Sequence, residues 1–312
     1  MANSFKEYLQ SQGKSKSTVS HYTTYALDFL SWLDRDNTEP EQATAKEVLA
    51  YLNHLQRRGQ ENKTRNIRLN VIKQFFTWQI EKGQRSDNPI QHLKIRGIQK
   101  QKLYPILDKQ QLESLYLNYQ VPNEEDERAN RNWFKSYRLS RARNKAILSL
   151  MINQGLTTAE VNRIKLTDLK LKEGKIYITG SRKSNERTME LKANQIIELM
   201  EYQFTTRNEL IETCGQTTEL LFISSPPVGR TTAKRMDCKE IWKRLNQDVK
   251  EQNQSFINFK QVRTSVITHW LKQYNLREVQ YMAGHRYVSS TEAYLVNQME
   301  DLRADIDEFY PF

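Results

Sequence analysis

The sequence predicts a mainly α-helical protein with two domains, and three observations indicate this. Glycine and proline are scarce, at 10 and 7 of 312 residues. Apolar residues recur along most of the chain at intervals of three and four, which is the spacing of one helix face. The length exceeds the ~100 to 200 residues typical of one domain. Pro89, in the segment DNPI, cannot continue a helix and therefore marks a boundary.

The N-terminal domain is predicted to span residues 1–93 and to contain four amphipathic helices. Their predicted positions are Phe5–Gln12, a second helix capped by Ser17 or Thr18, Ala45–Arg58 and Lys63–Lys82. Ser and Thr are expected as caps because their hydroxyls accept from free backbone N–H groups at a helix start. The basic segment 94–107, without clear periodicity, is predicted to be an interdomain linker.

The C-terminal domain is predicted to span residues 108–312 and to be mostly helical. Its predicted helices lie at about 108–117, 139–153, 158–166, 193–213, 238–253, 260–273 and 276–283. The polar stretch 118–132 is predicted to be an exposed loop. Between residues 175 and 191 the apolar residues alternate around a polar turn, so this segment is predicted to form a β-hairpin.

The chain is basic, with 48 Lys and Arg against 37 Asp and Glu and a net charge of +11. This charge favours a polyanionic partner, with nucleic acid ahead of an anionic membrane surface; a basic protein without such a partner is the alternative. Cys214 and Cys238 lack the spacing of a zinc site or a disulfide framework. We therefore expect a cytoplasmic protein with no metal and no cofactor. No apolar run of the length of a membrane span or signal peptide occurs.

The residues that could carry chemistry are concentrated near the C-terminus. Arg263 opens an apolar helix, His285 follows the glycine that ends the next helix, and Tyr294 comes nine residues later. Taken singly, these could be a surface arginine, a helix-capping histidine and a core tyrosine. Together they suit cleavage of a DNA phosphodiester, which needs a nucleophile and cations that support the phosphate charge. Arginine suits a phosphate because its planar fork donates two hydrogen bonds at once.

At these residues the sequence resembles the tyrosine recombinase family of the phage integrase type. The matching segments are KQVR at 260–263, AGH at 283–285 and STEAY at 290–294. The resemblance extends over most of the chain. It implies that residues 1–93 form a SAM-like core-binding domain and that residues 108–312 form the catalytic domain. It further implies an exchange helix at about 296–309 that docks on a neighbouring protomer.

The resemblance implies roles for individual residues. Tyr294 would be the nucleophile, Arg263 would clamp the scissile phosphate, and His285 would bind the phosphate or help to move protons. Lys183, on the hairpin turn, would be the general acid beside the leaving oxygen, with Arg182 as the alternative. Glu160 would orient the phosphate-binding arginine, although a glutamate in the first turn of a helix is also favourable by itself.

Two positions depart from the family pattern. Lys260 stands where the family usually has histidine, and a lysine cannot shuttle a proton near neutral pH as imidazole can. In QGLTTAEV, at 154–161, Thr157 stands where the family has its first arginine. A subgroup of mobile-element integrases lacks this arginine and still recombines. The substitute cation could be Arg143, Arg141, Arg163, Lys260 or a residue of a partner subunit.

The sequence thus predicts a site-specific recombinase or integrase that cleaves and rejoins DNA through a 3′-phosphotyrosine, for excision or integration of a mobile element. The resemblance implies double-stranded DNA and a homo-tetramer as partners, with accessory bending or directionality factors. The candidate DNA contacts are Lys14, Lys16, Lys63, Arg65, Arg68 and Lys73. The alternatives are a DNA-binding protein that no longer cuts and a type IB topoisomerase-like enzyme.

Overall fold

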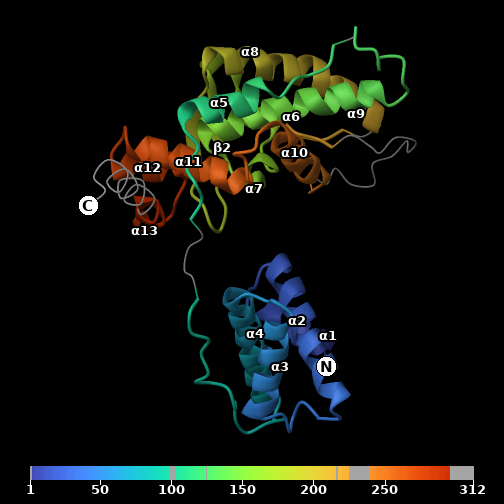
Figure 1. Cartoon of the computed structure of the whole chain (residues 1–312), viewed down its shortest axis with the longest axis vertical. Coiled ribbons are helices and arrows are strands. Elements are labelled where there is room, and N and C mark those ends of the chain that lie inside the picture. Colours follow the sequence, from blue (N-terminus) through green and yellow to red (C-terminus); the bar gives the residue numbers. More distant parts are fainter. Residues whose placement is uncertain (1, 99–102, 124, 216, 225–238, 296–312) are drawn as a thin grey trace. The chain divides into compact units, whose positions relative to one another are not determined.

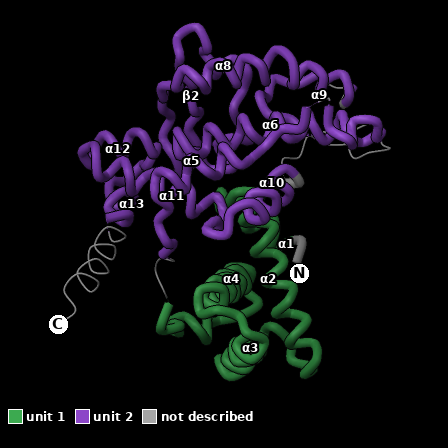
Figure 2. The backbone as a smooth tube through the Cα atoms, turned by 45° about the horizontal axis from the view of Figure 1, so that its top comes forward, with its two compact units in different colours: residues 1–102 green, residues 103–312 purple. Residues whose placement is uncertain are grey.

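The computed structural model describes residues 2–98, 103–123, 125–215, 217–224 and 239–295. The chain divides into two compact units, residues 1–102 and 103–312, which Figure 2 colours separately. This division falls inside the segment 94–107, where the sequence predicts a linker. Each unit encloses its own hydrophobic core. The predicted fold class is confirmed: both units are built mainly from helices.

The N-terminal unit is a bundle of four helices (Figure 1). They are α1 (Ala2–Ser11), α2 (Lys16–Arg35), α3 (Ala45–Arg57) and α4 (Asn62–Glu81). Helix α4 packs against the other three. An aromatic cluster joins α1 to α4. The centroid of the Phe5 ring lies 5.3 Å from that of Phe75 and 5.6 Å from that of Trp78.

The predicted cap of the second helix is wrong by a few residues. Ser15 is the N-cap of α2, and its Oγ accepts from the backbone N–H of Thr18 at 3.2 Å. Ser17 and Thr18 therefore lie inside the first turn. The serine nearest the glycine turn at Gly13 reaches the free N–H groups first, so the helix begins there.

The C-terminal unit is built around the long helix α6 (Phe134–Gln154), which packs against α5, α8, α9 and α11. Its helices besides α6 are α5 (Lys109–Leu117), α7 (Thr158–Val161), α8 (Ala193–Glu201), α9 (Arg207–Cys214), α10 (Lys239–Gln252), α11 (Phe259–Leu271), α12 (Leu276–Ala283) and α13 (Val288–Glu292). A π-helical turn, Tyr202–Thr206, joins α8 to α9 within the single helix predicted there. Leu148 and Leu150 of α6 and Val262 of α11 are fully buried in the core.

The predicted hairpin is confirmed as two strands of a small antiparallel sheet. The strands lie in the order β1 (Leu169–Lys170), β2 (Lys175–Ile178) and β3 (Arg187–Glu190), so β1 is a strand that was not predicted. Ile176 faces Met189 across the pair, and Ile178 faces Arg187.

The helix predicted at 158–166 is much shorter in the structure, where α7 ends at Val161. The backbone beyond it is used differently: Leu166 N–H donates to the Glu219 carbonyl at 2.9 Å, and Leu221 N–H donates to the Ile164 carbonyl at 2.8 Å. These distant pairings replace the helical hydrogen bonds that the local pattern favours. Among the described residues, no helix combines the length and apolar character needed to cross a bilayer.

Candidate active site

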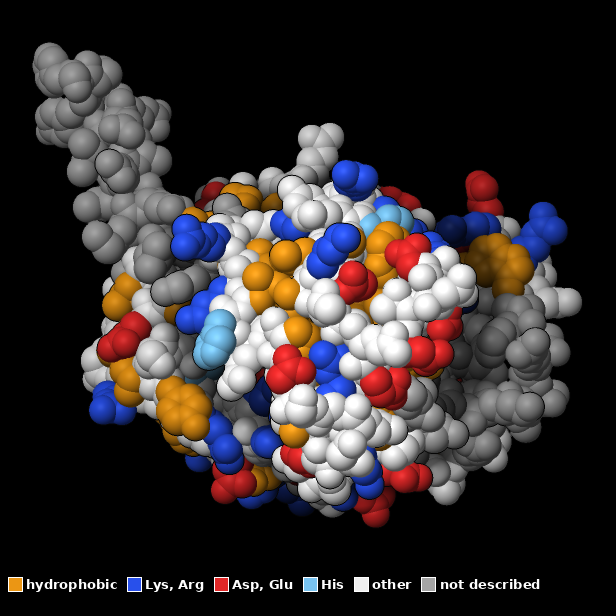
Figure 3. Space-filling model, turned by 90° about the horizontal axis from the view of Figure 1, so that it is seen from below, with side chains coloured by type: hydrophobic (Ala, Val, Ile, Leu, Met, Phe, Trp, Pro, Cys, Tyr) orange, Lys and Arg blue, Asp and Glu red, His pale blue; other side chains and the backbone are white. Residues whose placement is uncertain are grey.

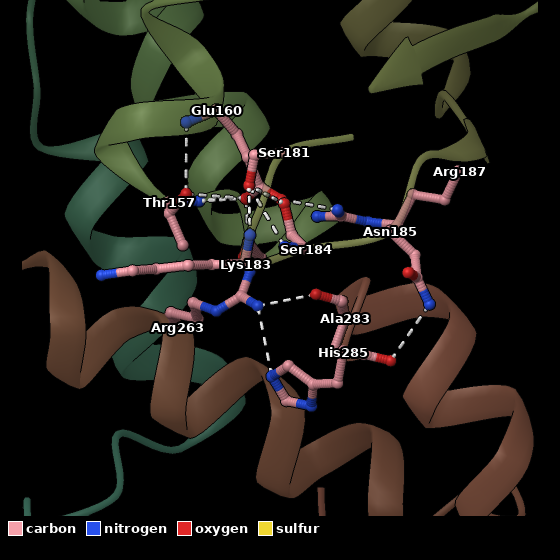
Figure 4. A network of polar contacts seen from close by, with 11 residues as sticks. Thr157, Glu160, Ser181, Lys183, Ser184, Asn185, Arg187, Arg263, Ala283 and His285 are labelled. Carbon is pink, nitrogen blue, oxygen red and sulfur yellow. Dashed lines mark hydrogen bonds and ion pairs between the residues drawn. The ribbon is translucent and has the colours of Figure 1, made fainter. Parts of the chain in front are cut away.

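Arg263 lies at the centre of a polar cluster in the C-terminal unit (Figure 4). Helix α11 carries it, and Asn258 caps that helix by accepting from Lys260 N–H and Gln261 N–H. The guanidinium donates to the Gly155 carbonyl at 2.5 Å and to the Ala283 carbonyl at 2.7 Å. Burial lowers the pKa of Arg263, while the charges of Glu160 and Tyr294 act in the opposite direction. The arginine thus connects the turn after α6 with the end of α12.

The turn after α6 is shaped by Gly155, which ends that helix in the left-handed region at φ 58°. A side chain here would be strained and would also press on Trp270 and Val266. Thr157 then caps α7: its Oγ accepts from Glu160 N–H at 3.2 Å and donates to the Glu160 carboxylate at 2.8 Å. Thr157 therefore has a structural role as half of a capping box.

Glu160 is a buried carboxylate that binds two guanidiniums. Its Oε1 accepts from Arg187 Nη1 at 2.6 Å, and its Oε2 lies 3.5 Å from Arg263 Nη1. Burial acts to raise the pKa of Glu160, but the hydrogen bond and charge of Arg187, aided by Arg263, outweigh burial and lower it to about 2. The carboxylate is therefore ionised near neutral pH and fixes both arginines.

His285 follows directly after Gly284, which ends α12 at φ 66°. Its Nδ1 lies 2.9 Å from Thr291 Oγ, and its Nε2 lies 3.4 Å from Arg263 Nη2. Burial, followed by the charges of Arg263 and Arg187, lowers the pKa of His285 to about 4. The imidazole is therefore neutral near pH 7, and its Nε2 can accept a hydrogen bond from the guanidinium.

Tyr294, the predicted nucleophile, stacks on His285. The two ring centroids are 5.6 Å apart and the ring planes are inclined by 16°. The tyrosine is half-buried and follows α13. It also interacts with Arg263, because it is among the groups that raise the pKa of that arginine. The structure thus brings Arg263, His285 and Tyr294 together.

The turn between β2 and β3 carries both candidates for the general acid. Arg182 and Lys183 are exposed there, next to Ser181 and Ser184, which are joined by an N–H to carbonyl bond of 2.8 Å. The same turn contacts the loop that holds His285, since Asn185 N–H donates to the Gly284 carbonyl at 2.9 Å. Figure 4 shows the Lys183 side chain extending past Thr157. Its choice over Arg182 stays a prediction.

Three of the other cations considered as substitutes for the missing arginine lie in different surroundings, whereas Arg163 has a buried Nε with no hydrogen-bond partner in the described structure. Arg141 donates to the Gln120 carbonyl and pairs with Asp248 at 3.0 Å. Arg143 donates to Asn144 and to the Ile223 carbonyl. The ammonium of Lys260 lies 5.9 Å from the Tyr104 ring centroid, on the exposed side of α11. The contacts that Glu160 makes to cations lead to Arg263 and Arg187 instead.

Arg187 is the site residue that sequence reasoning missed, although a signal was present. Ile176 and Ile178 occupy the buried face of β2, and Ile178 pairs with Arg187. Arg187 also lies two residues before Met189 and four before Leu191, both of which are buried. Strand alternation therefore places this arginine on the inward face. Charged residues are rarely buried without a partner, so a charge at an inward strand position indicates an ion pair or a functional site.

The six candidate DNA contacts of the N-terminal unit fall into two groups. Lys14, Lys16 and Lys63 are exposed. The other three differ from the expected free cations, because their side chains bind groups of their own unit; these are Arg65 with Gln56 and Asn62, Arg68 with Asp28 and Tyr51, and Lys73 with the carbonyls of Gln91 and Leu93. A basic residue on a helix can equally stabilise its own domain, and the sequence pattern does not separate the two uses.

Figure 3 shows acidic side chains interspersed with basic ones on the face that it presents, so the excess charge does not form a continuous patch there. The predicted exchange helix at about 296–309 lies outside the described residues. In the part of the chain that the structure describes, no group of three or more His, Cys, Asp and Glu side chains could hold a metal ion.

Two family models match this chain. A model of the phage integrase family matches residues 122–301, and a model of the phage integrase N-terminal SAM-like domain matches residues 1–85. The tyrosine recombinase XerC of Roseiflexus castenholzii is 25% identical over 282 residues, which cover 90% of this chain and 83% of the relative. The tyrosine recombinase XerA of Thermococcus kodakarensis is 23% identical over 300 residues, covering 96% and 91%.

Solved structures share the fold. A lambda integrase dimer bound to a COC′ core site matches with a TM-score of 0.63 and 17% identity, covering 94% of this chain and 93% of that one. The XerH recombinase in a post-cleavage complex with a palindromic difH substrate matches with a TM-score of 0.64 and 17% identity, covering 94% and 80%. Fold and site together define an enzyme of the tyrosine site-specific recombinase class. The chain belongs to the phage integrase family, as its sequence resemblance implied.

Proposed function

We propose that this recombinase cuts and rejoins DNA through a 3′-phosphotyrosine on Tyr294, in the excision or integration of a mobile element. The observation that carries the proposal is the assembly of Tyr294, His285 and Arg263 around one buried carboxylate, Glu160. These residues come from separate helices and loops. Their convergence places a nucleophile beside a fixed cation and a neutral imidazole.

The proposed reaction exchanges one ester for another. The Tyr294 oxygen attacks the scissile phosphorus, a new O–P bond forms, and the bond from phosphorus to the 5′ oxygen breaks. Arg263 donates to the phosphate oxygens as charge accumulates on them. A pKa lowered to about 4 makes the neutral imidazole of His285 a weak base, so in this proposal it relays the phenol proton to water and does not hold it. Religation reverses these steps and consumes no ATP.

The leaving 5′ oxygen needs a proton, and we assign Lys183 as its donor, with Arg182 as the alternative. Both lie on an exposed turn that contacts the His285 loop through Asn185 and Gly284. A lysine is the better acid, because its pKa lies near 10 in water whereas that of arginine is above 12.

The partners of the reaction are proposed from relatives. The lambda integrase structures include a tetramer bound to a Holliday junction, with a TM-score of 0.63 to this chain. A Tn1549 transposon integrase with circular intermediate DNA matches with a TM-score of 0.61, which supports the mobile-element interpretation. We accordingly propose that four copies act on two double-stranded DNA sites, and that accessory bending or directionality factors take part.

Covalent capture tests the proposed cleavage and identifies the target sequence in the same experiment. Wild-type protein is incubated with a pool of duplexes that carry a randomised core and a nick, so that cleavage releases a short strand and traps the enzyme. We expect an adduct that survives denaturation, and sequencing of the attached DNA gives the target site. Tyr294→Phe should give no adduct, because it lacks the attacking oxygen. DNA binding without any wild-type adduct would support a protein that no longer cuts.

A second measurement separates recombination from topoisomerase activity. Plasmids carrying two copies of the captured site should exchange segments, giving deletion or inversion according to the orientation of the sites. Relaxation of supercoils without such products would favour the topoisomerase-like alternative. Thr157→Arg should not be required for the adduct; recovery of activity only in this variant would mean that the threonine is a lesion.

A further inference from the structure

Thr157 contributes no cation to the site, and its side chain is already hydrogen-bonded to Glu160. Both its N–H and its Oγ lie 2.8 Å from Glu160 Oε2 as donors. A hydroxyl bound in this way cannot neutralise a phosphate. If two guanidiniums act on the scissile phosphate, the second must enter from another element.

Arg187 enters the same site from β3. Its Nη1 binds Glu160 at 2.6 Å, and the other oxygen of that carboxylate lies 3.5 Å from Arg263. Two guanidiniums on one carboxylate are immediate neighbours. Arg187 also reaches the loop that holds His285: a side chain on Gly284 would overlap the Arg187 Nη1 atom. Arg187, Arg263 and His285 therefore surround one small region.

The hydrogen bonding of Arg187 is incomplete. Its side chain is fully buried, yet Nε and Nη2 have no hydrogen-bond partner in the described structure. Leaving a buried donor unpaired costs about 1–3 kcal/mol, and more for a charged group. Such groups in native proteins call for an explanation, and an acceptor supplied by a ligand is one. A phosphate has the planar pairs of oxygens that a guanidinium fork binds best.

We propose that Arg187 is a catalytic residue that supplies the second guanidinium at the scissile phosphate, in place of the arginine that the chain lacks at Thr157. This inference rests on the proposed DNA cleavage. Arg187 and Arg263, held by Glu160, would donate to the phosphate oxygens while Tyr294 attacks. The proposal adds no bond-making step. It assigns the compensating charge to a strand residue instead of a helix residue.

The Arg187 side chain is fully buried, so part of its surroundings must move before it can reach DNA, and the turn between β2 and β3 lies next to it in the chain. In the free protein Asn185 N–H donates to the Gly284 carbonyl at 2.9 Å, and Ser184 forms an isolated bridge with His285. These contacts place the turn against the loop that Arg187 touches. We therefore expect DNA to displace this turn, which carries Lys183 and leads directly into Arg187.

The rate of adduct formation on the captured duplex tests the role of Arg187. We expect Arg187→Met to form adduct about 100- to 1000-fold more slowly than wild type, as for the loss of one donor to a developing oxyanion. A second duplex carries a methylphosphonate at the scissile position, which removes the negative charge. On that duplex the two proteins should differ by less than about tenfold, because the missing charge is no longer needed. Lys183→Ala should stay slow on it, since its defect concerns the leaving group.

Two further variants keep the test decisive. Arg141→Met removes a different buried arginine of the same unit and should form adduct at the wild-type rate on both duplexes, measured well below its melting temperature. Arg187→Lys retains a charge beside Glu160 if Arg187→Met fails to fold, and it should show a smaller loss with the same rescue.

The outcomes distinguish this inference from the proposed function. Wild-type protein that forms no adduct contradicts the proposed cleavage itself. If wild type forms adduct and Arg187→Met matches it on the ordinary duplex, the inference about Arg187 alone is wrong. It is equally wrong if Arg187→Met is slowed to the same extent on both duplexes, because the arginine would then only hold Glu160 in place.

Discussion

Two of the buried arginines of the C-terminal unit, Arg141 and Arg187, differ in how far their hydrogen bonds are satisfied. Arg141, in the first half of α6, donates from Nε and Nη2 to the Gln120 carbonyl at 2.9 and 2.7 Å. Its Nη1 pairs with Asp248 at 3.0 Å, and its guanidinium lies 3.7 Å from the Tyr119 ring centroid. Arg187, at the start of β3, has Glu160 as partner for Nη1 and none for Nε and Nη2 in the described structure.

This difference separates a residue of the scaffold from a residue of the site. The chain itself supplies the acceptors of Arg141, so that guanidinium stabilises the fold and needs nothing more. The chain leaves part of Arg187 without acceptors at a position where burial makes this costly. Burial of a charge alone therefore does not indicate function, whereas burial with unmet hydrogen bonds on the carboxylate that also binds Arg263 does.

The largest effect on stability is expected at Glu160. Replacing it with glutamine keeps the shape but leaves Arg187 and Arg263 without their shared counter-charge. Removing one partner of a buried ion pair costs roughly 3–5 kcal/mol, and the free energy of unfolding in urea should fall by about this amount. A loss below about 1 kcal/mol would mean that the two arginines find other acceptors.

The pH dependence of stability should identify the same group. Glu160 has an ordinary pKa of 4.5 and a folded-state pKa of about 2. Its contribution is therefore present above pH 4.5 and is lost as the pH falls toward 2, by about 3 kcal/mol in total. The pKa of His285 is lowered from 6.5 to about 4, so the unfolded chain binds this proton first. The folded state therefore loses stability as the pH falls from 6.5 to 4, which lies above the range of Glu160. Urea unfolding at stepped pH should show that Glu160→Gln loses only the lower dependence.

A smaller loss is expected for Arg141→Met. Its partner Asp248 keeps a side-chain exposure of 29%, so water can solvate the carboxylate that is left behind. We expect the free energy of unfolding to fall by roughly 2 kcal/mol, with no effect on the adduct rate of the folded protein. A slower adduct rate in folded Arg141→Met would mean that the scaffold arginine and the site are coupled.

Two glycines share a backbone conformation, and the smallest effect is expected at one of them. Gly284 and Gly215 both have positive φ, at 66° and 63°. An alanine at Gly215 costs about 1–2 kcal/mol of strain, which thermal unfolding measures, and the loss at Gly284 should be larger because the overlap with Arg187 adds to the strain. Only Gly284→Ala should also slow adduct formation, since its methyl group would displace Arg187, whereas nothing lies within 4 Å at Gly215. Equal adduct rates in the two variants would argue against a role for the Arg187 position.

Much of the fold was predictable because it depends on local pattern. The helix ranges of the N-terminal unit came from apolar spacing and glycine breaks, and the predicted hairpin came from alternation. The failures have a common cause. The segment after Val161 leaves its helix to pair with Glu219 and Leu221, which are distant in sequence. Arg65, Arg68 and Lys73 satisfy acceptors of their own unit, which no local pattern discloses.

The sequence by itself determined the family and the order of its motifs, since Arg263, His285 and Tyr294 stand at diagnostic spacings. It also showed that the expected cation is absent at Thr157. Only the tertiary structure decided which cation lies beside Glu160. Arg187 is 27 residues from that carboxylate along the chain. Strand pairing places it on the inward face, and Gly284, which has no side chain, leaves room for its guanidinium. Contacts between residues far apart in sequence depend on packing, and packing is a property of the whole fold.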